Sequence, residues 1–210
     1  MKKITLSLVS VIALSGMSFA GGDFEPVVEP VVAVPVVVED TSGFYLGAGL
    51  AAVSTRDATV NGSFFDAKGG QDRLGNLTFL AGYDFNRYIA AEGRFTTSIA
   101  DEDIVEMSGW SLFAKPQYAF DGSNFKIYAL LGFGGVTLDS MNADYVTDVD
   151  DTAFQWGIGA AYSFGEYMED NNLAVFVDYT SLATDMEGIY WNGAPETDVD
   201  AITAGVTYRF

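Results

Sequence analysis

The sequence predicts an all-β protein, an eight-stranded antiparallel up-and-down transmembrane β-barrel, and three observations lead to that prediction. From residue 41 onward, eight stretches of about ten residues alternate apolar with small or polar side chains, as strands between lipid and a barrel interior do. The connections after the second, fourth and sixth stretches are short, and the others are long. Four stretches end in Tyr-x-Phe, which places two aromatic rings on one face of a strand, as expected at a membrane boundary.

The first four predicted strands cover residues 44–53, 77–85, 88–97 and 110–120. The first sets bulky residues such as Phe44 on one side, with Tyr45 and small residues on the other, and the second repeats this pattern. The third places Glu92 and Arg94 on its inner face, which argues against the core of a soluble sandwich. In the fourth, Pro116 falls on the lipid side, so we expect a bulge or a local break there, because proline donates no ladder hydrogen bond.

The last four predicted strands cover residues 125–136, 154–164, 173–179 and 201–210. The fifth alternates apolar residues with an inner row that begins at Lys126. The sixth has the clearest pattern, with an unbroken apolar row on one face and small or polar residues on the other. The seventh and eighth place Asp178 and Arg209 on their inner faces.

Loop lengths predict the orientation, because short turns face the periplasm and long loops face outward in barrels of this kind. The residues of the Tyr-x-Phe motifs are then interfacial aromatics at the periplasmic end: Tyr83, Phe85, Tyr118, Phe120, Tyr162, Phe164, Tyr208 and Phe210. Trp110 and Trp156 stand at the opposite ends of the fourth and sixth strands, where we expect the outer aromatic girdle. Both chain termini are expected in the periplasm.

Acidic residues gather in the last three long connections. These connections contain neither lysine nor arginine, and fourteen acidic residues are assigned to them: Asp101, Glu102, Asp103, Glu106, Asp139, Asp144, Asp148, Asp150, Asp151, Asp185, Glu187, Glu196, Asp198 and Asp200. We expect these loops to be acidic and extracellular. A divalent cation on the oxygen ligands around Asp148 is an alternative to a plain solvated loop, although the pattern of a calcium loop is missing.

The first forty residues are expected to lie outside the barrel domain, which covers residues 41–210. Residues 1–20 resemble a signal peptide, with Lys2 and Lys3 before a short apolar stretch and cleavage after Ala20; a membrane anchor is the alternative. Residues 21–40 are rich in proline and valine, which favours an extended periplasmic linker over a helix. An alternative is that this linker docks a partner or lies against the barrel mouth.

Composition narrows the possible functions. The chain has 210 residues and no cysteine or histidine, so the usual general base, the commonest metal ligand and thiolate chemistry are all missing. We therefore expect no enzyme, no cofactor and no metal site. The net charge of -19, or -21 once the two signal lysines are removed, argues against binding to nucleic acid.

The signal peptide, the eight alternating strands, the loop lengths and the final Tyr208-Arg209-Phe210 together resemble the small outer-membrane β-barrel family that includes the OmpA transmembrane domain and the opacity and OmpX-like proteins. The resemblance implies a monomer in the outer membrane of a Gram-negative cell, in contact with lipid and lipopolysaccharide. It also implies that Tyr208 and Phe210 form the signal read by the outer-membrane assembly machinery. The chain ends at Phe210, so the peptidoglycan-binding domain of full-length OmpA-type proteins is not expected.

Two interpretations of the inward charges remain open from the sequence. Six residues form the expected interior charge network: Glu92, Arg94, Lys115, Lys126, Asp178 and Arg209. Their mutual pairing would make a structural polar core, because unpaired buried ions are costly. Alternatively, they line or gate a narrow path for ions or small solutes, an alternative that the many inward glycines and alanines keep open.

Surface interaction is the other expected role, since outward loops on a rigid barrel often carry binding functions. Tyr190 and Trp191 in the last loop are candidates for contact with an unknown surface ligand, or they pack on the barrel rim. Lipid A-modifying barrels, as the resemblance implies, use histidine with serine and an acidic residue, and this chain has no histidine. We therefore expect a structural or surface-interaction protein, with a narrow pore as the alternative.

Overall fold

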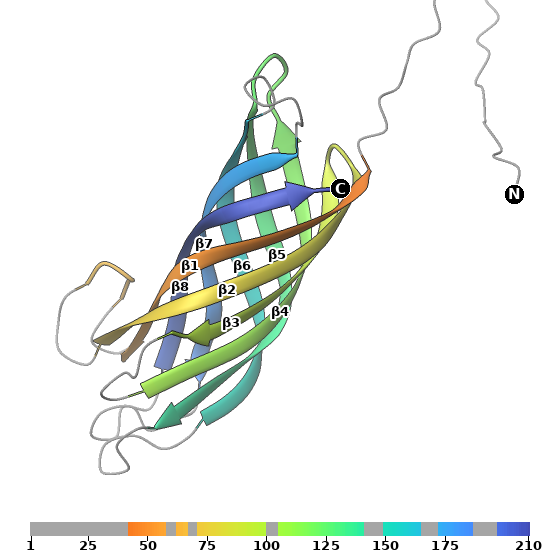
Figure 1. Cartoon of the computed structure of the whole chain (residues 1–210). Coiled ribbons are helices and arrows are strands. Elements are labelled where there is room, and N and C mark those ends of the chain that lie inside the picture. The colour runs from red at the N-terminus through yellow and green to blue at the C-terminus, as the bar shows by residue number, and fades with distance from the viewer. Residues whose placement is uncertain are drawn as a thin grey trace, which may run out of the picture. The chain divides into compact units, whose positions relative to one another are not determined.

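The structure is a computed structural model that describes residues 42–57, 62–66, 71–99, 105–140, 149–164, 172–186 and 197–210. It contains eight strands: β1 (Gly43–Asp57), β2 (Gln71–Asn86), β3 (Ile89–Ser98), β4 (Val105–Ala119), β5 (Phe125–Ser140), β6 (Val149–Ser163), β7 (Leu173–Met186) and β8 (Thr197–Arg209). Each strand pairs antiparallel with its neighbour in sequence, and β8 pairs with β1 to close the barrel (Figure 1). The predicted fold class is confirmed.

Side chains alternate between the barrel interior and its outer surface. On β1, Tyr45 and Val53 are buried. Phe44, next to Tyr45, is 67% exposed, and Leu50, which lies between the two buried residues, is 63% exposed. The other strands follow the same alternation over most of their length, so the outer face carries most of the exposed large apolar residues. At the long-loop end the alternation in burial stops, and consecutive residues are buried at 53–56, 181–183 and 199–201. An apolar outer face and a filled interior are what a strand between lipid and a narrow lumen requires. Within the described ranges, no helix is long and apolar enough to cross a membrane.

The two ends of the barrel differ in their connections. We call the end with the turns at residues 87–88 and 121–124 the short-turn end, and the opposite end the long-loop end. At the short-turn end, Arg87 of one turn donates a 2.6 Å hydrogen bond to Asp121 of the other. This hydrogen bond raises the pKa of the exposed Arg87 guanidinium above its usual value and ties the two turns together.

The strands extend further toward the long-loop end than the sequence pattern predicts. β1 ends at Asp57 instead of residue 53, β2 begins at Gln71 instead of 77, and β7 ends at Met186 instead of 179. Seven acidic residues expected in loops therefore lie in strands: Glu106, Asp139, Asp150, Asp151, Asp185, Asp198 and Asp200. The prediction was wrong because it ended each strand where the outer residues become polar, whereas backbone pairing continues. The other seven of the fourteen acidic residues assigned to loops lie outside the described residues.

Pro116 interrupts the ladder between β4 and β5, as predicted. Ala114 pairs with Leu131 and Gln117 with Tyr128, and no pair is formed between these two positions. The register is the same on both sides, so the irregularity is a local break without a bulge. On the lipid-facing side, an apolar groove of about 860 Å³ lies beside Pro116.

The Tyr-x-Phe motifs lie at the short-turn end, where the rings of each motif contact one another. Their centroids are 5.2, 5.3, 5.5 and 5.2 Å apart, in edge-to-face geometry. Trp110 and Trp156 face outward, but they are the sixth residue of β4 and the eighth of β6. Their expected position at the strand ends was wrong, because both strands begin earlier than the apolar pattern does.

Several sequence-based expectations concern other parts of the chain. The expected signal peptide (residues 1–20) and linker (residues 21–40) lie outside the described residues, as do Tyr190 and Trp191.

Candidate functional site

The middle of the lumen holds a buried group of charged side chains centred on Glu92 of β3. Its carboxylate accepts hydrogen bonds from the Tyr45 hydroxyl (2.6 Å), the Lys115 ammonium (2.6 Å) and Arg94 Nε (2.8 Å). Glu92 is 1% exposed. Strand alternation points its side chain and those of its three donors inward from β1, β3 and β4. The carboxylate is thus surrounded by donors, as a buried charge requires.

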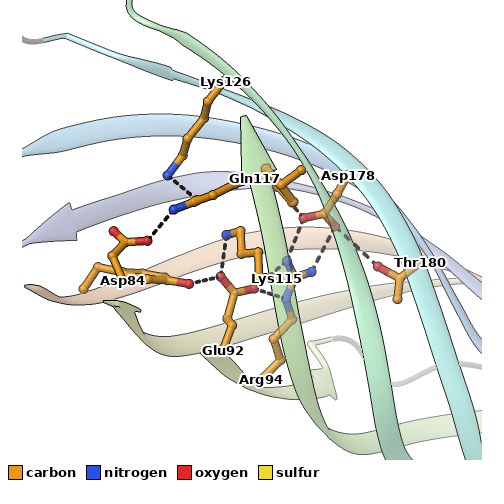
Figure 2. A network of polar contacts seen from close by, with 10 residues as sticks. Asp84, Glu92, Arg94, Lys115, Gln117, Lys126, Asp178 and Thr180 are labelled. Carbon is orange, nitrogen blue, oxygen red and sulfur yellow. Dashed lines mark hydrogen bonds and ion pairs between the residues drawn. The ribbon is translucent and has the colours of Figure 1, made fainter. Parts of the chain in front are cut away.

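Arg94 extends this group across the barrel to β7. Its two terminal nitrogens donate to both oxygens of Asp178, at 2.9 and 2.7 Å, in a bidentate ion pair (Figure 2). The Tyr128 hydroxyl donates to the same carboxylate at 2.8 Å. Because Arg94 contacts Glu92 on one side and Asp178 on the other, one guanidinium joins strands on opposite parts of the wall.

Aromatic rings and glycines complete this buried group. The Lys115 ammonium lies 4.1 Å from the centroid of the Tyr128 ring, within the range of a cation–π contact. A Cβ at Gly159 would lie 2.6 Å from Tyr128 Cζ, and one at Gly82 would collide with the Tyr45 ring. These inward glycines therefore make room for the tyrosines, instead of leaving an open path.

A second polar group lies nearer the short-turn end. Gln117 donates to Asp84 at 2.8 Å and accepts a hydrogen bond from the Lys126 ammonium at 3.1 Å (Figure 2). Arg209 Nε lies 4.0 Å from the other oxygen of Asp84. This group borders a cavity of about 90 Å³.

The structure brings the six expected charges into these two groups. Glu92, Arg94, Lys115 and Asp178 contact one another directly, whereas Lys126 and Arg209 belong to the second group. Four partners of these charges were not predicted from the sequence: Asp84, Tyr45, Tyr128 and Gln117. Alternation placed all four on inner faces, so a search for any hydrogen-bonding side chain there, and not for charge alone, would have found them.

The long-loop half of the lumen is filled differently. Eleven buried apolar residues form one cluster, each at most 7% exposed: Ala51, Val53, Leu74, Met107, Val136, Leu138, Leu182, Ala183, Met186, Val199 and Ala201. They come from β1, β2, β4, β5, β7 and β8, so the cluster spans the barrel. We call it the apolar cluster. Apart from the fully buried Asn76, which lies against Met107, an ion passing along the lumen would meet side chains that offer it no ligand.

Gln155 of β6 is an exception among the buried polar residues. It is fully buried, and neither its amide nitrogen nor its amide oxygen has a hydrogen-bond partner in the part of the chain that the structure describes. It lies against Gly134, where an added Cβ would be 2.5 Å from the Gln155 amide oxygen. An unpaired buried amide is destabilising.

The chemical repertoire of this site follows from its residue types. The chain offers neither histidine nor cysteine, and no three Asp or Glu among the described residues converge to hold a metal ion. The two groups can pair charges, fix strands relative to one another and, at the small cavity, contact a polar solute.

Comparison with solved structures identifies similar barrels. Ail, the attachment invasion locus protein of Yersinia pestis, is 17% identical, with a TM-score of 0.53 over 80% of this chain and 99% of that chain. Neisserial surface protein A is 19% identical, with a TM-score of 0.49 over 80% of this chain and 99% of that one. The N-terminal barrel of Pseudomonas aeruginosa OprF is 15% identical, with a TM-score of 0.49 over 78% and 97%. At these identities the likeness to Ail shows the fold alone.

Sequence comparison gives the family. No curated protein sequence matches the chain. The family model described as "Outer membrane protein beta-barrel domain" matches residues 7–210, nearly the whole chain. The chain therefore belongs to the family of outer-membrane protein β-barrel domains.

Proposed function

We propose that this outer-membrane barrel is a closed scaffold with a structural and cell-surface interaction role. The observation that carries the proposal is the filled lumen, in which the apolar cluster and the paired charges around Glu92 occupy successive levels. A barrel of eight strands encloses an interior that side chains can fill completely. Binding functions are then carried by the outer wall and by the connections at the two ends of the barrel.

The alternative of a narrow pore receives less support. The inward charges are engaged with each other, and Glu92, Arg94, Lys115 and Asp178 are each at most 8% exposed. Opening a path would also require the apolar cluster to separate, which exposes its side chains and gives an ion no ligands.

The proposal includes an orientation. The short turns and both termini face the periplasm, and the long connections, with their acidic residues, face outward. Tyr208 and Phe210 are 43% and 71% exposed on the wall, which suits a segment that the assembly machinery must reach. The outer wall contacts lipid, its outward part contacts lipopolysaccharide, and the protein acts as a monomer.

Catalysis is not part of the proposal. Histidine is the most frequent general base and cysteine the most readily activated nucleophile, and the chain has neither. The buried carboxylates are engaged with cations and tyrosines instead.

Planar-bilayer recording tests the closed lumen. The refolded full chain should insert without discrete conductance steps, because ions cannot cross the apolar cluster. Reproducible steps of constant size that disappear in Arg94→Ala or Lys115→Ala would support the pore instead.

Binding of oligolysine to intact cells that express the chain tests the acidic outward loops. The variant Asp144→Asn/Asp148→Asn/Glu187→Gln/Glu196→Gln should bind less oligolysine, most clearly at low salt. Asp121→Asn, at the short-turn end, should bind as the wild type does, because it faces the periplasm. Loss of binding in Asp121→Asn alone would reverse the orientation.

Tryptophan quenching tests the candidate contact residues of the last loop. The chain has three tryptophans, so the double variant Trp110→Phe/Trp156→Phe leaves Trp191 as the only one. Iodide in water should quench Trp191 if it is available to a partner. Trp110 and Trp156 should instead be quenched by brominated lipid in Trp191→Phe. Failure of iodide to reach Trp191 would favour packing on the rim.

A further inference from the structure

The short-turn side of the lumen carries a surplus of positive charge. Between the apolar cluster and the short-turn end, the described residues place four cations (Arg94, Lys115, Lys126, Arg209) against three carboxylates (Asp84, Glu92, Asp178). The whole chain has 10 basic and 29 acidic residues, so this interior has the opposite balance to the protein around it. A positive interior in an acidic protein requires a specific explanation.

Lys126 is where the surplus is found. Glu92 and Asp178 are already bound by Arg94 and Lys115, whereas the hydrogen-bond partner of Lys126 is the neutral amide oxygen of Gln117, at 3.1 Å. Among the described residues, no carboxylate lies within 4.0 Å of the Lys126 ammonium. An ammonium has three hydrogens to donate, so Lys126 can bind a further acceptor.

A cavity next to Lys126 can accommodate such an acceptor. Its volume is about 90 Å³, and the polar side chains around it are Tyr45, Asp84, Lys115, Lys126, Ser163, Asn172, Thr207 and Arg209. A cavity of this size has room for several water molecules, or for one small oxyanion. The Ser163 and Thr207 hydroxyls, the Arg209 guanidinium and the Lys126 ammonium can donate hydrogen bonds to a bound anion, whereas Tyr45 and Lys115 already donate to Glu92.

We propose that this cavity is a binding site for a small oxyanion, such as inorganic phosphate or a short carboxylate. Lys126 is its principal ligand, Thr207 and Ser163 donate further hydrogen bonds, and Arg209 and Lys115 add positive potential. A charge-assisted hydrogen bond from a partly buried ammonium is stronger than one between neutral groups. The site lies inside the wall, so its ligand is a free ion and not the headgroup of a lipid in the surrounding bilayer. It depends neither on the proposed surface role nor on the orientation.

Titration of the refolded full chain in a maltoside detergent, which contains no phosphate, tests the site. Calorimetry and the linewidth of the ³¹P signal should show saturable one-to-one binding of inorganic phosphate. Lys126→Met should weaken this binding at least about tenfold, and Lys126→Arg should retain it. The matched control is Arg87→Gln, which removes an exposed arginine at the same end and should leave the affinity unchanged.

Titrations with other anions and with further variants distinguish an oxyanion site from nonspecific binding. Acetate that binds as well as phosphate supports a carboxylate ligand, whereas chloride that binds equally well at matched ionic strength contradicts an oxyanion site. If Lys126→Met does not refold, Thr207→Val and Ser163→Ala keep every charge and should each weaken phosphate binding several-fold. The proposal is wrong if the wild type shows no saturable binding, or if none of these substitutions lowers the affinity.

Discussion

On the long-loop side, aliphatic and thioether side chains fill most of the lumen, with a few buried polar residues such as Asn76 beside them. On the short-turn side, paired charged side chains lie among a second cluster of buried apolar residues that includes Phe113, Leu130 and Phe176. Both halves are buried to a similar degree: Leu74 and Glu92 are each 1% exposed. The two fillings nevertheless differ in what they do. The apolar cluster opposes the passage of ions because its own side chains offer them no ligand, and the paired charges fix which strands face each other.

The charged half depends on partners far apart in sequence. Arg94 of β3 meets Asp178 of β7, and Tyr128 of β5 meets the same carboxylate. A missing partner leaves a buried ion, so errors in this half are costly, whereas an apolar side chain tolerates a neighbour of similar volume. The comparison therefore predicts that substitutions in the two halves differ in both size and kind.

The largest effect is expected for Arg94→Met. This substitution leaves Asp178 buried with hydrogen bonds only from Tyr128 and Thr180, and should lower the free energy of unfolding by about 3–5 kcal/mol. Urea unfolding in detergent, followed by tryptophan fluorescence, measures it. The double variant Arg94→Met/Asp178→Asn should recover part of the loss, because the unpaired charge is removed. A double variant as unstable as the single one would contradict the pairing.

Leu74→Ala probes the apolar half in the same assay. The side chain is 1% exposed, and its truncation should cost about 2–5 kcal/mol through lost burial and the cavity it leaves. Unlike Arg94→Met, no second substitution of a charged residue should restore stability. A loss much smaller than this range would indicate that the cluster is loosely packed.

Gln155→Met should act in the opposite direction. The change replaces an amide that lacks partners among the described residues by an apolar side chain of similar shape, and should raise stability by about 1 kcal/mol. A loss of stability would show that the Gln155 amide has hydrogen-bond partners, such as bound water, and that water lies at the boundary between the two halves.

The smallest effect is expected at the exposed ion pair between the turns. Arg87→Gln removes a pair whose side chains are 42% and 83% exposed, so no resolvable change in stability should follow. A loss comparable to that of Arg94→Met would mean that burial is not what separates the two kinds of ion pair.

Much of this arrangement could be predicted from the sequence. Period-two alternation gave the number of strands and the face on which Glu92, Arg94 and Asp178 lie, because a single-residue shift would expose every one of these charges to lipid. The break at Pro116 followed from the missing amide hydrogen. Local rules were sufficient for these features, since each depends on one strand alone.

Other features required information from several strands at once. The stagger of the strands in the closed barrel determines which cation pairs with which carboxylate. The pattern of a single strand does not specify this stagger. The inward glycines suggested space in the lumen, yet Gly82 and Gly159 accommodate tyrosine rings from other strands. The apolar cluster was missed because inner residues such as Val136 and Met186 lie near or beyond the expected strand ends.

Thiol accessibility tests the closed lumen most directly, and the chain suits it because it has no native cysteine. Val136→Cys places a thiol in the apolar cluster, Thr207→Cys places one at the small cavity, and Phe65→Cys serves as an exposed control. With a water-soluble methanethiosulfonate reagent, the folded protein should react rapidly at positions 65 and 207 and hardly at all at position 136, until urea unfolds it. Equal reaction rates at positions 136 and 207 in the folded barrel would contradict the account, because they would show a water-filled path through the apolar cluster.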